Sequence, residues 1–233
     1  MLISVWSPKG GSGTSIVAAV IAAAVAKSHP DVRLVDLLGD QPAVCGVRLN
    51  ARVGACELLA SESELHDGAV DALTVDIHEA FRLVPAGRAQ LAGVTAARGA
   101  AVARALRYAL PLYVVDAGCA ATPAVAALVR ASDVALMVMR PCFLALQHAS
   151  LRVDLVERST GIVCISEPGR ALGARDLVSV LGRPVLCEFD VDPDVARSVD
   201  AGMLLRREPH GVFAPISRMC RRLGLSMVDE DAA

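Results

Sequence analysis

One glycine-rich segment near the start of the chain limits the possible folds more than any other feature. Residues 7–15 read SPKGGSGTS, after the apolar run Leu2–Trp6 and before the alanine-rich stretch Thr14–Lys27. The apolar run predicts a buried strand, and an alanine-rich stretch without glycine or proline predicts a helix. Glycines between a strand and a helix let successive backbone N–H groups turn toward one anion, and the helix start adds further donors. The segment therefore predicts a phosphate-binding loop; the alternative is a turn of small residues that binds nothing.

The rest of the chain alternates between the same two kinds of element. Short apolar runs predict further strands at residues 33–37, 80–84, 112–115, 134–139, 161–165 and 185–189. The stretches between them predict helices at residues 53–60, 100–110, 122–131, 142–157, 171–181, 195–201 and 215–223, the last with proline in its first turn. Because no hairpin signals separate the strands, crossover connections and a largely parallel sheet are expected.

The composition agrees with a sheet that is buried on both faces. Hydrophobic residues make up 54% of the 233 residues but aromatic residues only 3%, so the core must consist of Ala, Val, Leu and Ile. We expect one α/β domain over residues 1–225, followed by an acidic tail at residues 226–233. The domain should hold a doubly wound, mostly parallel sheet of about seven strands flanked by helices. Ligands of such sheets bind beyond the carboxyl ends of the strands, where residues 8–15, 36–41 and 116–119 fall.

Cysteines, histidines and net charge argue against several other classes of protein. The seven cysteines are scattered without a CxxC pair, so zinc and iron–sulfur sites are not expected, and several are interpreted as small core residues. Unclustered thiols, no evident signal peptide and no apolar stretch of bilayer length favour a cytoplasmic protein. The five dispersed histidines are expected at the surface rather than in catalysis. A net charge of -2 gives no reason to expect binding to nucleic acid.

The glycine loop departs from the common phosphate-binding pattern GxxxxGK[ST]. Thr14 stands at the lysine position and Pro8 at the first glycine position, whereas Lys9 comes earlier, directly before the glycine pair. The run KGGSG followed by Ser15 resembles the loop KGGxGK[ST] of the deviant Walker A ATPases of the MinD/ParA group. This resemblance implies that the loop binds ATP or ADP with Mg²⁺. It also implies a homodimer in which Lys9 reaches the phosphates of the partner subunit.

The second strand resembles the same family in part. Residues 34–36, Leu-Val-Asp, are similar to the family motif VDxD, whose second aspartate positions the attacking water. Leu38 stands at the place of that second aspartate, and Asp40 is the nearest carboxylate that could replace it. Loss of the aspartate would weaken the positioning of the water.

Two later segments extend the resemblance. Residues 113–116, Tyr-Val-Val-Asp, resemble the Walker B strand, which implies that Asp116 holds Mg²⁺ through water and that Gly118 offers its N–H to the γ-phosphate. Residues 189–193 resemble the segment that wraps the adenine, although the usual proline is missing at Asp190.

The resemblance implies a full set of site residues. The nucleotide-binding residues would be Lys9, Gly10, Gly11, Ser12, Gly13, Thr14, Ser15, Asp36, Gly118, Asp192 and Pro193. The Mg²⁺ ligands would be Ser15 and Asp116, and the residues that act in hydrolysis would be Lys9, Asp40 and Asp116. Because Thr14 supplies a hydroxyl where a lysine would stabilise transition-state charge, we expect slow or absent hydrolysis.

Three functions remain open. The first is a nucleotide-dependent dimer switch that recruits an unidentified protein partner. It would position pilus or secretion machinery, because Gly39-Asp40 resembles the CpaE/TadZ branch, or the septum site. The second is a pseudo-ATPase scaffold that dimerises and localises partners without nucleotide turnover. The third is a ParA-like DNA-partitioning ATPase, which the negative net charge and the lack of aromatic residues among the C-terminal arginines disfavour.

The expected last helix carries Ile216, Met219, Cys220 and Leu223 on one face. MinD-like relatives bind membranes through a basic amphipathic C-terminal helix, so peripheral contact with the inner face of the plasma membrane is one option. The favoured interpretation is that the helix packs on the sheet, because the acidic tail would weaken attraction to anionic lipid.

Overall fold

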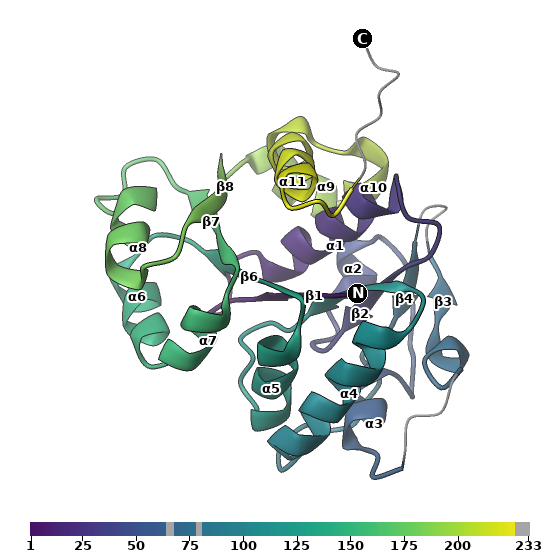
Figure 1. Ribbon diagram of the computed structural model, residues 1–233. Helices are drawn as coiled ribbons and strands as arrows, with labels where there is room; N and C mark the ends of the chain where they lie inside the picture. The colour runs from purple at the N-terminus through teal and green to yellow at the C-terminus, as the bar shows by residue number, and fades with distance from the viewer. Residues whose placement is uncertain (64–67, 78–80, 227–233) are drawn as a thin grey trace.

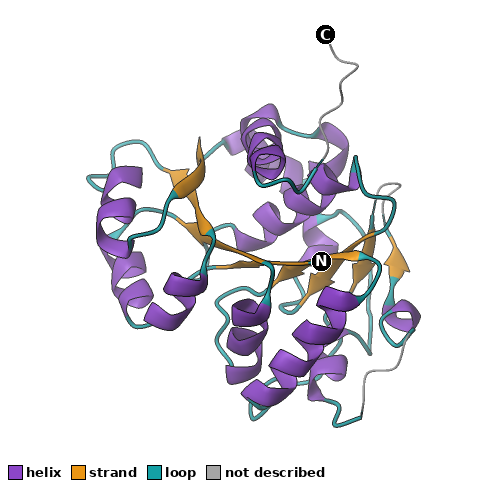
Figure 2. Cartoon of the chain, in the orientation of Figure 1, coloured by secondary structure: helices purple, strands orange, loops and turns teal. Residues whose placement is uncertain are grey.

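The centre of the protein is an eight-stranded sheet, seen in a computed structural model that describes residues 1–63, 68–77 and 81–226 (Figures 1 and 2). The strands are β1 (Leu2–Trp6), β2 (Val32–Asp36), β3 (Val75–Asp76), β4 (Arg82–Val84), β5 (Leu112–Asp116), β6 (Val134–Met139), β7 (Gly161–Ser166) and β8 (Val185–Asp190). Their order in space is β3-β4-β2-β5-β1-β6-β7-β8. Every neighbouring pair is parallel except β3 and β4. The predicted doubly wound, mostly parallel α/β fold is therefore confirmed.

Helices cover both faces of this sheet (Figure 2). They are α1 (Thr14–Ala26), α2 (Gln41–Val44), α3 (Ala55–Ala60), α4 (Ala96–Tyr108), α5 (Pro123–Ala131), α6 (Phe143–Ser150), α7 (Val153–Arg158), α8 (Ala174–Leu181), α9 (Pro193–Asp200), α10 (Leu204–Arg207) and α11 (His210–Arg222). Helices α1, α2, α9, α10 and α11 pack on one face, and α3 to α8 pack on the other. Alternate residues of β1 enter the two cores: Ile3 and Val5 join the first, Leu2 and Trp6 the second.

Helix α1 is buried almost all round, which explains why alanine dominates its sequence. Residues 17–25 are all buried, between the sheet on one side and α11 on the other. Small side chains let a helix approach two neighbours closely, so a bulkier or charged face would not fit here. This packing places the start of α1 next to the end of β1, where the glycine loop lies.

The predicted helix over residues 142–157 is wrong as a single element. The chain forms α6 and α7, and Arg152 between them has φ −126° and ψ 41°, which is not helical. The guanidinium of Arg152 donates instead to the backbone carbonyls of Cys119 and Ala120. These contacts come from a segment more than thirty residues away, so local periodicity could not reveal the break.

The predicted last helix, 215–223, begins too late. Helix α11 starts at His210 and contains Pro215 in its interior, where the missing N–H removes one hydrogen bond. Burial of Val212 and Phe213 in the core extends the helix ahead of the proline. The apolar face with Ile216, Met219 and Cys220 is buried against the first core, so the interpretation that this helix packs on the sheet is confirmed.

Other elements were not expected from the sequence. Strand β3 adds an antiparallel edge of two residues, and α2, α10 and the 3-10 helix Asp71–Leu73 are each too short to leave a periodic pattern. The start of the predicted strand 80–84, His66, His78 and residues 227–233 of the acidic tail lie outside the described residues. In the part of the chain that the structure describes, no helix is both long enough and apolar enough to cross a membrane.

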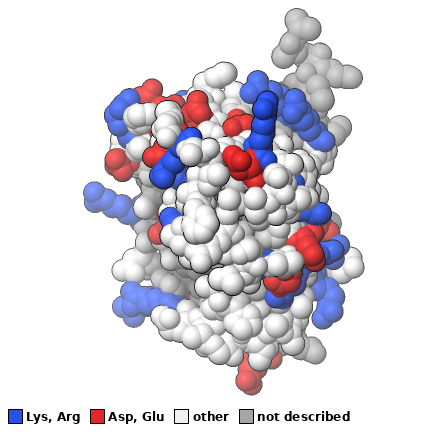
Figure 3. Space-filling model, turned by 90° about the vertical axis from the view of Figure 1, so that its left-hand side faces the viewer, with Lys and Arg blue, Asp and Glu red and all other residues white. Residues whose placement is uncertain are grey.

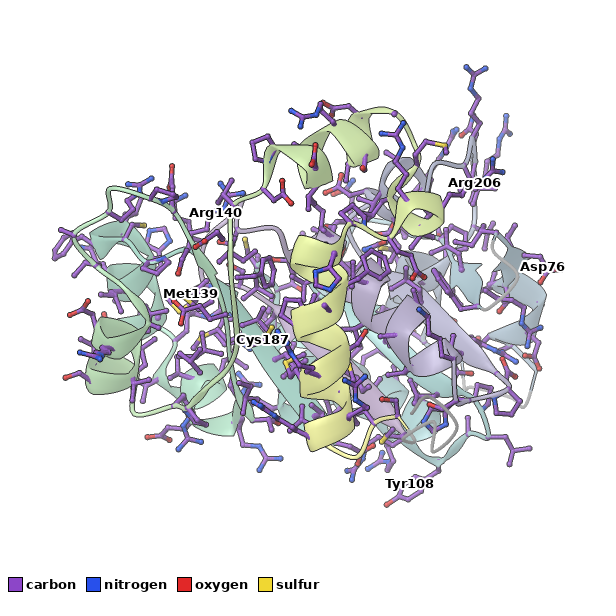
Figure 4. All side chains as sticks on the ribbon, turned by 90° about the horizontal axis from the view of Figure 1, so that it is seen from above. Asp76, Tyr108, Met139, Arg140, Cys187 and Arg206 are labelled. Carbon is purple, nitrogen blue, oxygen red and sulfur yellow. The ribbon has the colours of Figure 1, made fainter. Side chains whose placement is uncertain are left out.

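Because all strands except β3 are parallel, their carboxyl ends lie along one edge of the sheet, the carboxyl edge, and their amino ends lie along the opposite one. In Figure 4, Tyr108, which precedes β5, and Arg140, which follows β6, lie on opposite sides of the molecule. The loops that follow β1, β2 and β5 all leave at the carboxyl edge. The three segments predicted to bind a ligand therefore converge there.

The tight contact between α4 and α5 depends on one glycine. A Cβ on Gly99 would overlap the carbonyl oxygen of Ala124, which is backbone and cannot move away easily. We expect Gly99→Ala to lower the free energy of unfolding by about 1–3 kcal/mol, although alanine alone favours a helix. Urea denaturation followed by circular dichroism measures the change. Ala97→Ser, which adds one atom on the exposed side of the same helix, should stay within about 0.5 kcal/mol of wild type; equal losses in both variants would contradict the packing argument.

Candidate functional site

The glycine loop is held in shape by its own backbone and hydroxyl groups. The N–H of Ser7 donates to the carbonyl of Gly118 at 2.8 Å, which ties the loop to the segment after β5. The hydroxyls of Ser7 and Ser12 both donate to the carbonyl of Lys9, each at 2.7 Å. Gly11 and Gly13 have φ of 73° and 90°, a left-handed conformation that side chains rarely allow. The glycine spacing in the sequence thus reflects backbone geometry.

The loop offers a continuous row of free hydrogen-bond donors. Within residues 1–63, 68–77 and 81–226, no hydrogen bond uses the backbone N–H of any residue from Gly10 to Ile16. The first N–H groups of any helix have no partner within that helix, but here the free donors begin four residues before α1. Such a row at a helix N-terminus attracts and binds an anion. This is the feature that a phosphate-binding loop requires.

A buried hydrogen-bond network lies beside the loop and centres on Asp116. This carboxylate, at the end of β5, is fully buried and pairs in register with Val5 of β1 and Asp36 of β2. The N–H of Gly118 donates to it at 3.2 Å, and the side-chain hydroxyl of Ser15 interacts with it and lowers its pKa. The structure therefore brings together the predicted ligands Ser15 and Asp116.

Gln41, the first residue of α2, completes this network. Its side chain is fully buried, and Nε2 donates to Asp116 Oδ2 at 2.8 Å and to the carbonyl of Ser15 at 3.0 Å. Sequence reasoning missed this residue. Gln41 precedes a proline after Gly39-Asp40, a pattern typical of an exposed turn, so no local signal marked it as buried.

Burial raises the pKa of the Asp116 carboxyl to about 6. Hydrogen bonds from Ser15, Gln41 and the N–H of Gly118 oppose this shift, and the nearby Asp36 adds to it. A cation beside Asp116 would favour the ionised form. The site is thus electrostatically suited to a divalent metal ion.

Asp36 shapes the loop after β2. Its buried carboxylate accepts hydrogen bonds from the N–H groups of Leu38, Gly39 and Gln41, at 2.9, 2.8 and 3.1 Å. Burial raises its pKa, and these three donors oppose the rise. The observed role of Asp36 is to hold the segment that carries Gln41; its predicted contact with nucleotide stays a prediction.

Two other residues of the loop after β2, Asp40 and Leu38, lie at the surface and not in the buried network. Asp40 is exposed at the start of α2, and its side chain makes no hydrogen bond with any described residue. Leu38 is 51% exposed and lies over Gly118: a Cβ on this glycine would come within 2.6–2.9 Å of the Leu38 side chain. An apolar group therefore covers the place where the resemblance implies a water-positioning carboxylate.

Lys9 and Thr14 lie at the two ends of the glycine loop. The ammonium group of Lys9 is exposed and donates to the carbonyl of Gly10 at 3.3 Å. Thr14 is buried as the first residue of α1, so it cannot supply the cation of an ordinary loop lysine.

Asp192 and Pro193 lie farther along the carboxyl edge, after β8. The carboxylate of Asp192 accepts the N–H of Asp194 at 2.8 Å and caps α9, whose first residue is Pro193. Across the described ranges no hydrogen bond joins either residue to the glycine loop, whose neighbour on that side is Ile165 of β7. Their contact with a base stays a prediction.

Most of the cysteines lie in the core. All seven are free thiols; Cys45, Cys56, Cys164, Cys187 and Cys220 are buried, which confirms their interpretation as core residues. Figure 4 shows Cys187 of β8 beside α11. Among the residues that the structure describes, no group of three or more His, Cys, Asp or Glu side chains could hold a metal ion.

Comparison with known proteins identifies the fold. No family model matches the sequence, and no curated protein matches it. The septum site-determining protein MinD of Pyrococcus horikoshii OT3, complexed with Mg-ADP, has a TM-score of 0.73 at 16% identity, covering 95% of each chain. A chain of the MinC:MinD cell division protein complex of Aquifex aeolicus has a TM-score of 0.73 at 18% identity, covering 97% of this chain and 96% of that one. The ParA family ATPase of Chlorobium tepidum TLS has a TM-score of 0.71 at 18% identity, covering 95% and 98%. The chain therefore has the fold of these ATPases.

The raised pKa of Asp116 makes stability depend on pH in the absence of magnesium. An acid with a higher pKa in the folded than in the unfolded chain binds its proton more tightly when folded, so protonation favours folding. The stability that protonated Asp116 contributes to the folded chain is greatest below pH 3.8 and is lost as the pH rises toward about 6. Relative to Asp116→Asn, the free energy of unfolding of the wild type should fall by about 2–3 kcal/mol from pH 4 to pH 7, measured by urea denaturation in EDTA.

Asp133 provides a control, because its pKa is shifted in the opposite direction and its effect on stability should depend on pH in the opposite way. Partial burial raises its pKa, but the N–H of Leu2 and the guanidinium of Arg107 lower it more, so the net pKa is lowered. Relative to Asp133→Asn, wild-type stability should stay nearly constant from pH 5 to pH 7 and fall only in more acidic solution. A wild-type-to-Asp116→Asn difference that does not change with pH would contradict the burial of an ionisable Asp116.

Proposed function

We propose that this chain is a MinD/ParA-like nucleotide-binding protein that acts as a nucleotide-dependent dimer switch. It binds ATP or ADP with Mg²⁺ and positions cellular machinery through a protein partner. Hydrolysis of ATP is slow or absent. The observation that carries this proposal is the row of free N–H groups from Gly10 to Ile16, directly beside the paired Ser15 and Asp116 side chains.

The donor set fits a magnesium–nucleotide complex. The free N–H groups would bind the phosphate oxygens, and the helix dipole of α1 would favour their charge. The hydroxyl of Ser15 would bind Mg²⁺ directly and the carboxylate of Asp116 would bind it through water, with Gln41 holding that carboxylate in place. Bound Mg²⁺ would neutralise phosphate charge. The Pyrococcus MinD structure, which holds Mg-ADP on the same fold, supports this assignment.

The same residues argue against rapid hydrolysis. Phosphoryl transfer depends on positioned positive charge and on a positioned water. Thr14 carries no charge, Leu38 places an apolar side chain over Gly118, and Asp40 is exposed without a hydrogen bond to the site. The site is better built to hold a nucleotide than to cleave it.

Lys9 supports the dimer part of the proposal. Its ammonium group is exposed at the carboxyl edge, and its hydrogen bond to Gly10 is weak at 3.3 Å. It is therefore free to move to the phosphates of a second copy placed against this edge. That the Aquifex MinD was solved with a protein partner, MinC, supports a partner of the dimer.

Two alternatives are weaker. A scaffold that dimerises without nucleotide would also tolerate Thr14 and Leu38, but it gives no reason for the row of free donors. DNA partitioning has little support on the face shown in Figure 3, where basic and acidic side chains are interspersed. In Figure 4, Arg206 of α10 and Arg140 lie well apart along the upper part of the molecule, so these two arginines do not form one basic patch.

Nucleotide binding is tested by thermal stabilisation. A ligand that binds only the folded protein increases the free energy of unfolding, by about 2.7 kcal/mol at a concentration of 100 times Kd, and so raises the melting temperature. For a chain of this length we expect millimolar MgADP or MgATP to raise Tm by about 5–10 °C. Calorimetry or dye-based melting measures the shift, and the ligand without Mg²⁺ should give a smaller one.

Ser15→Ala and Ser28→Ala separate binding from folding. Both remove one hydroxyl, but Ser28 lies just after α1, at the end remote from the loop, and among the described residues its hydroxyl donates to the carbonyl of Val25 alone. Ser15→Ala should lose most of the magnesium-dependent shift and Ser28→Ala should keep it. No shift in the wild type would overturn nucleotide binding and favour the scaffold.

Hydrolysis is tested by restoring the missing groups. Removing one charge-stabilising group from an enzyme site costs about 10²–10³-fold in turnover. We therefore expect the double variant Thr14→Lys, Leu38→Asp to hydrolyse ATP at least about 10-fold faster than wild type. Phosphate release measures both rates. Wild-type turnover already equal to that of the double variant would show that the site needs neither group.

A further inference from the structure

Strand β8 ends the sheet on one side, and its outer side, which faces away from β7, is called here the β8 edge. Within the residues that the structure describes, β8 pairs with β7 alone. The N–H of Val191, directly after β8, donates to the carbonyl of Ser166 at 2.8 Å, so Val191 faces β7. Because alternate residues of a parallel strand bond to the same neighbour, Phe189 also faces β7, and Glu188 and Asp190 point their backbone groups outward.

The outward backbone groups of the β8 edge are open. Both Glu188 and Asp190 are exposed, and across the described ranges no hydrogen bond uses the backbone N–H or C=O of either residue. Earlier in the strand the register shifts at Leu186, which is an extra residue relative to β7 and forms a β-bulge. The regular part of the edge therefore runs from Glu188 to Asp190 and can pair with a short added strand.

A hollow of about 240 Å³ lies beside this edge, between β8 and α11. Leu186, Cys187 and Met219 are among the residues that line it, and Arg218 and Arg222 line it from α11. In Figure 4, β8, marked by Cys187, runs alongside α11. A chain that paired with the β8 edge would therefore lie next to both arginines.

The two arginines of the hollow carry charge that has no counterpart. Arg218 and Arg222 are exposed, and neither forms an ion pair or a hydrogen bond with any residue that the structure describes. Their charge reaches β8: burial raises the pKa of the Cys187 thiol to about 12, and both guanidinium groups oppose that rise. Unpaired cations beside open backbone groups favour a partner with acidic side chains.

The two faces of the β8 edge differ in charge. Cys187 belongs to the core under α11, whereas Glu188 is the register partner of Cys164, which belongs to the opposite core. Side chains alternate along a strand, so Asp190 shares the face of Glu188. The Glu188 carboxylate accepts the hydroxyl of Ser166 at 2.8 Å on that face. The edge is thus basic toward α11 and acidic on the other side.

We propose that the β8 edge binds an extended segment of a partner protein as an added strand, with acidic side chains at alternate positions facing Arg218 and Arg222. Residues two apart in a strand are separated by about 6.7 Å, and residues four apart in a helix by about 6 Å, so two such acids match both arginines. Backbone hydrogen bonds hold the segment, and the alternating charges select it. The inference goes beyond the proposed function, because neither the glycine loop nor a nucleotide takes part.

Charge disfavours a second copy of this chain as the occupant. An antiparallel pair of β8 strands about a twofold axis would bring Glu188 and Asp190 of both copies to one face, and Arg218 and Arg222 of both copies to the other. Like charges opposite each other on neighbouring strands are destabilising. A segment with acids on the arginine face and neutral residues on the other avoids both repulsions.

The test uses synthetic peptides on the full chain. The probe is fluorescein-labelled Thr-Glu-Thr-Glu-Thr-Glu-Thr, and its control is Thr-Lys-Thr-Lys-Thr-Lys-Thr. Fluorescence anisotropy should show saturable binding of the first and at least about 10-fold weaker binding of the second, since an exposed ion pair accounts for up to about 5-fold and two are reversed. Hydrogen exchange measured by NMR should slow at the amides of Glu188 and Asp190 when the acidic peptide binds.

Two variants separate backbone pairing from charge. Glu188→Pro removes an outward N–H and leaves the bonds to β7, because proline is tolerated in an edge strand where the N–H faces solvent. We expect it to weaken the acidic peptide by about 10-fold, through one lost hydrogen bond and the proline ring. Glu188→Thr, the matched control, keeps the N–H and should bind at least as tightly as wild type. The double variant Arg218→Glu, Arg222→Glu should also lose about 10-fold or more, and it decides the question if Glu188→Pro does not fold.

Each outcome supports or overturns the inference. Binding with slowed exchange at Glu188 and Asp190, lost in both variants, supports it. Binding that Glu188→Pro leaves unchanged, or no binding at all, overturns it. Binding only after removal of residues 227–233 would make the acidic tail the occupant, and a dimer seen by sedimentation and abolished by Glu188→Pro would make it a second copy; either result overturns a partner segment. The thermal shift with nucleotide is independent of all these results.

Discussion

One buried carboxylate organises the carboxyl edge of the sheet. Asp116 is fully buried at the end of β5, and an ionised carboxylate in such a place is stable only when donors surround it. Gln41 from α2 and the N–H of Gly118 donate to it, and interaction with Ser15 from α1 also favours its ionised form. Each comes from a different element, so satisfying this one charge fixes how the elements meet.

The neighbouring loops depend on the same arrangement. Asp36, the register partner of Asp116, gathers three N–H groups and so turns the chain to place Gln41 inward. The hydrogen bond from Ser7 to Gly118 joins the glycine loop to the turn that follows Asp116. If the proposed function holds, such a site is preorganised, because these contacts hold its loops in place before a ligand arrives.

The departures from a common phosphate loop fall at positions where charge or water would act in catalysis. Gly11, Gly13 and the free N–H groups, which would serve binding in the proposed function, are present. The family resemblance places Thr14 and Leu38 at the positions of a lysine and a water-positioning aspartate, and neither side chain carries a charge. Binding uses many backbone donors and tolerates such losses. Cleavage depends on a few charges at fixed positions, so it does not tolerate their loss.

The sequence alone predicted the parallel α/β fold and the glycine loop from local patterns: apolar runs, an alanine-rich helix and a cluster of glycines between a strand and that helix. The joint role of Ser15 and Asp116 was implied by the family resemblance. Only the tertiary structure decided that Gln41 is buried against Asp116, 75 residues away, and that Arg152 interrupts a helix to hold a turn 32 residues earlier. It also decided that α11 extends ahead of Pro215. In each case the local preference was overcome by a contact with residues distant in sequence, and a hydrogen bond or buried side chain that depends on such a partner leaves no periodic signal.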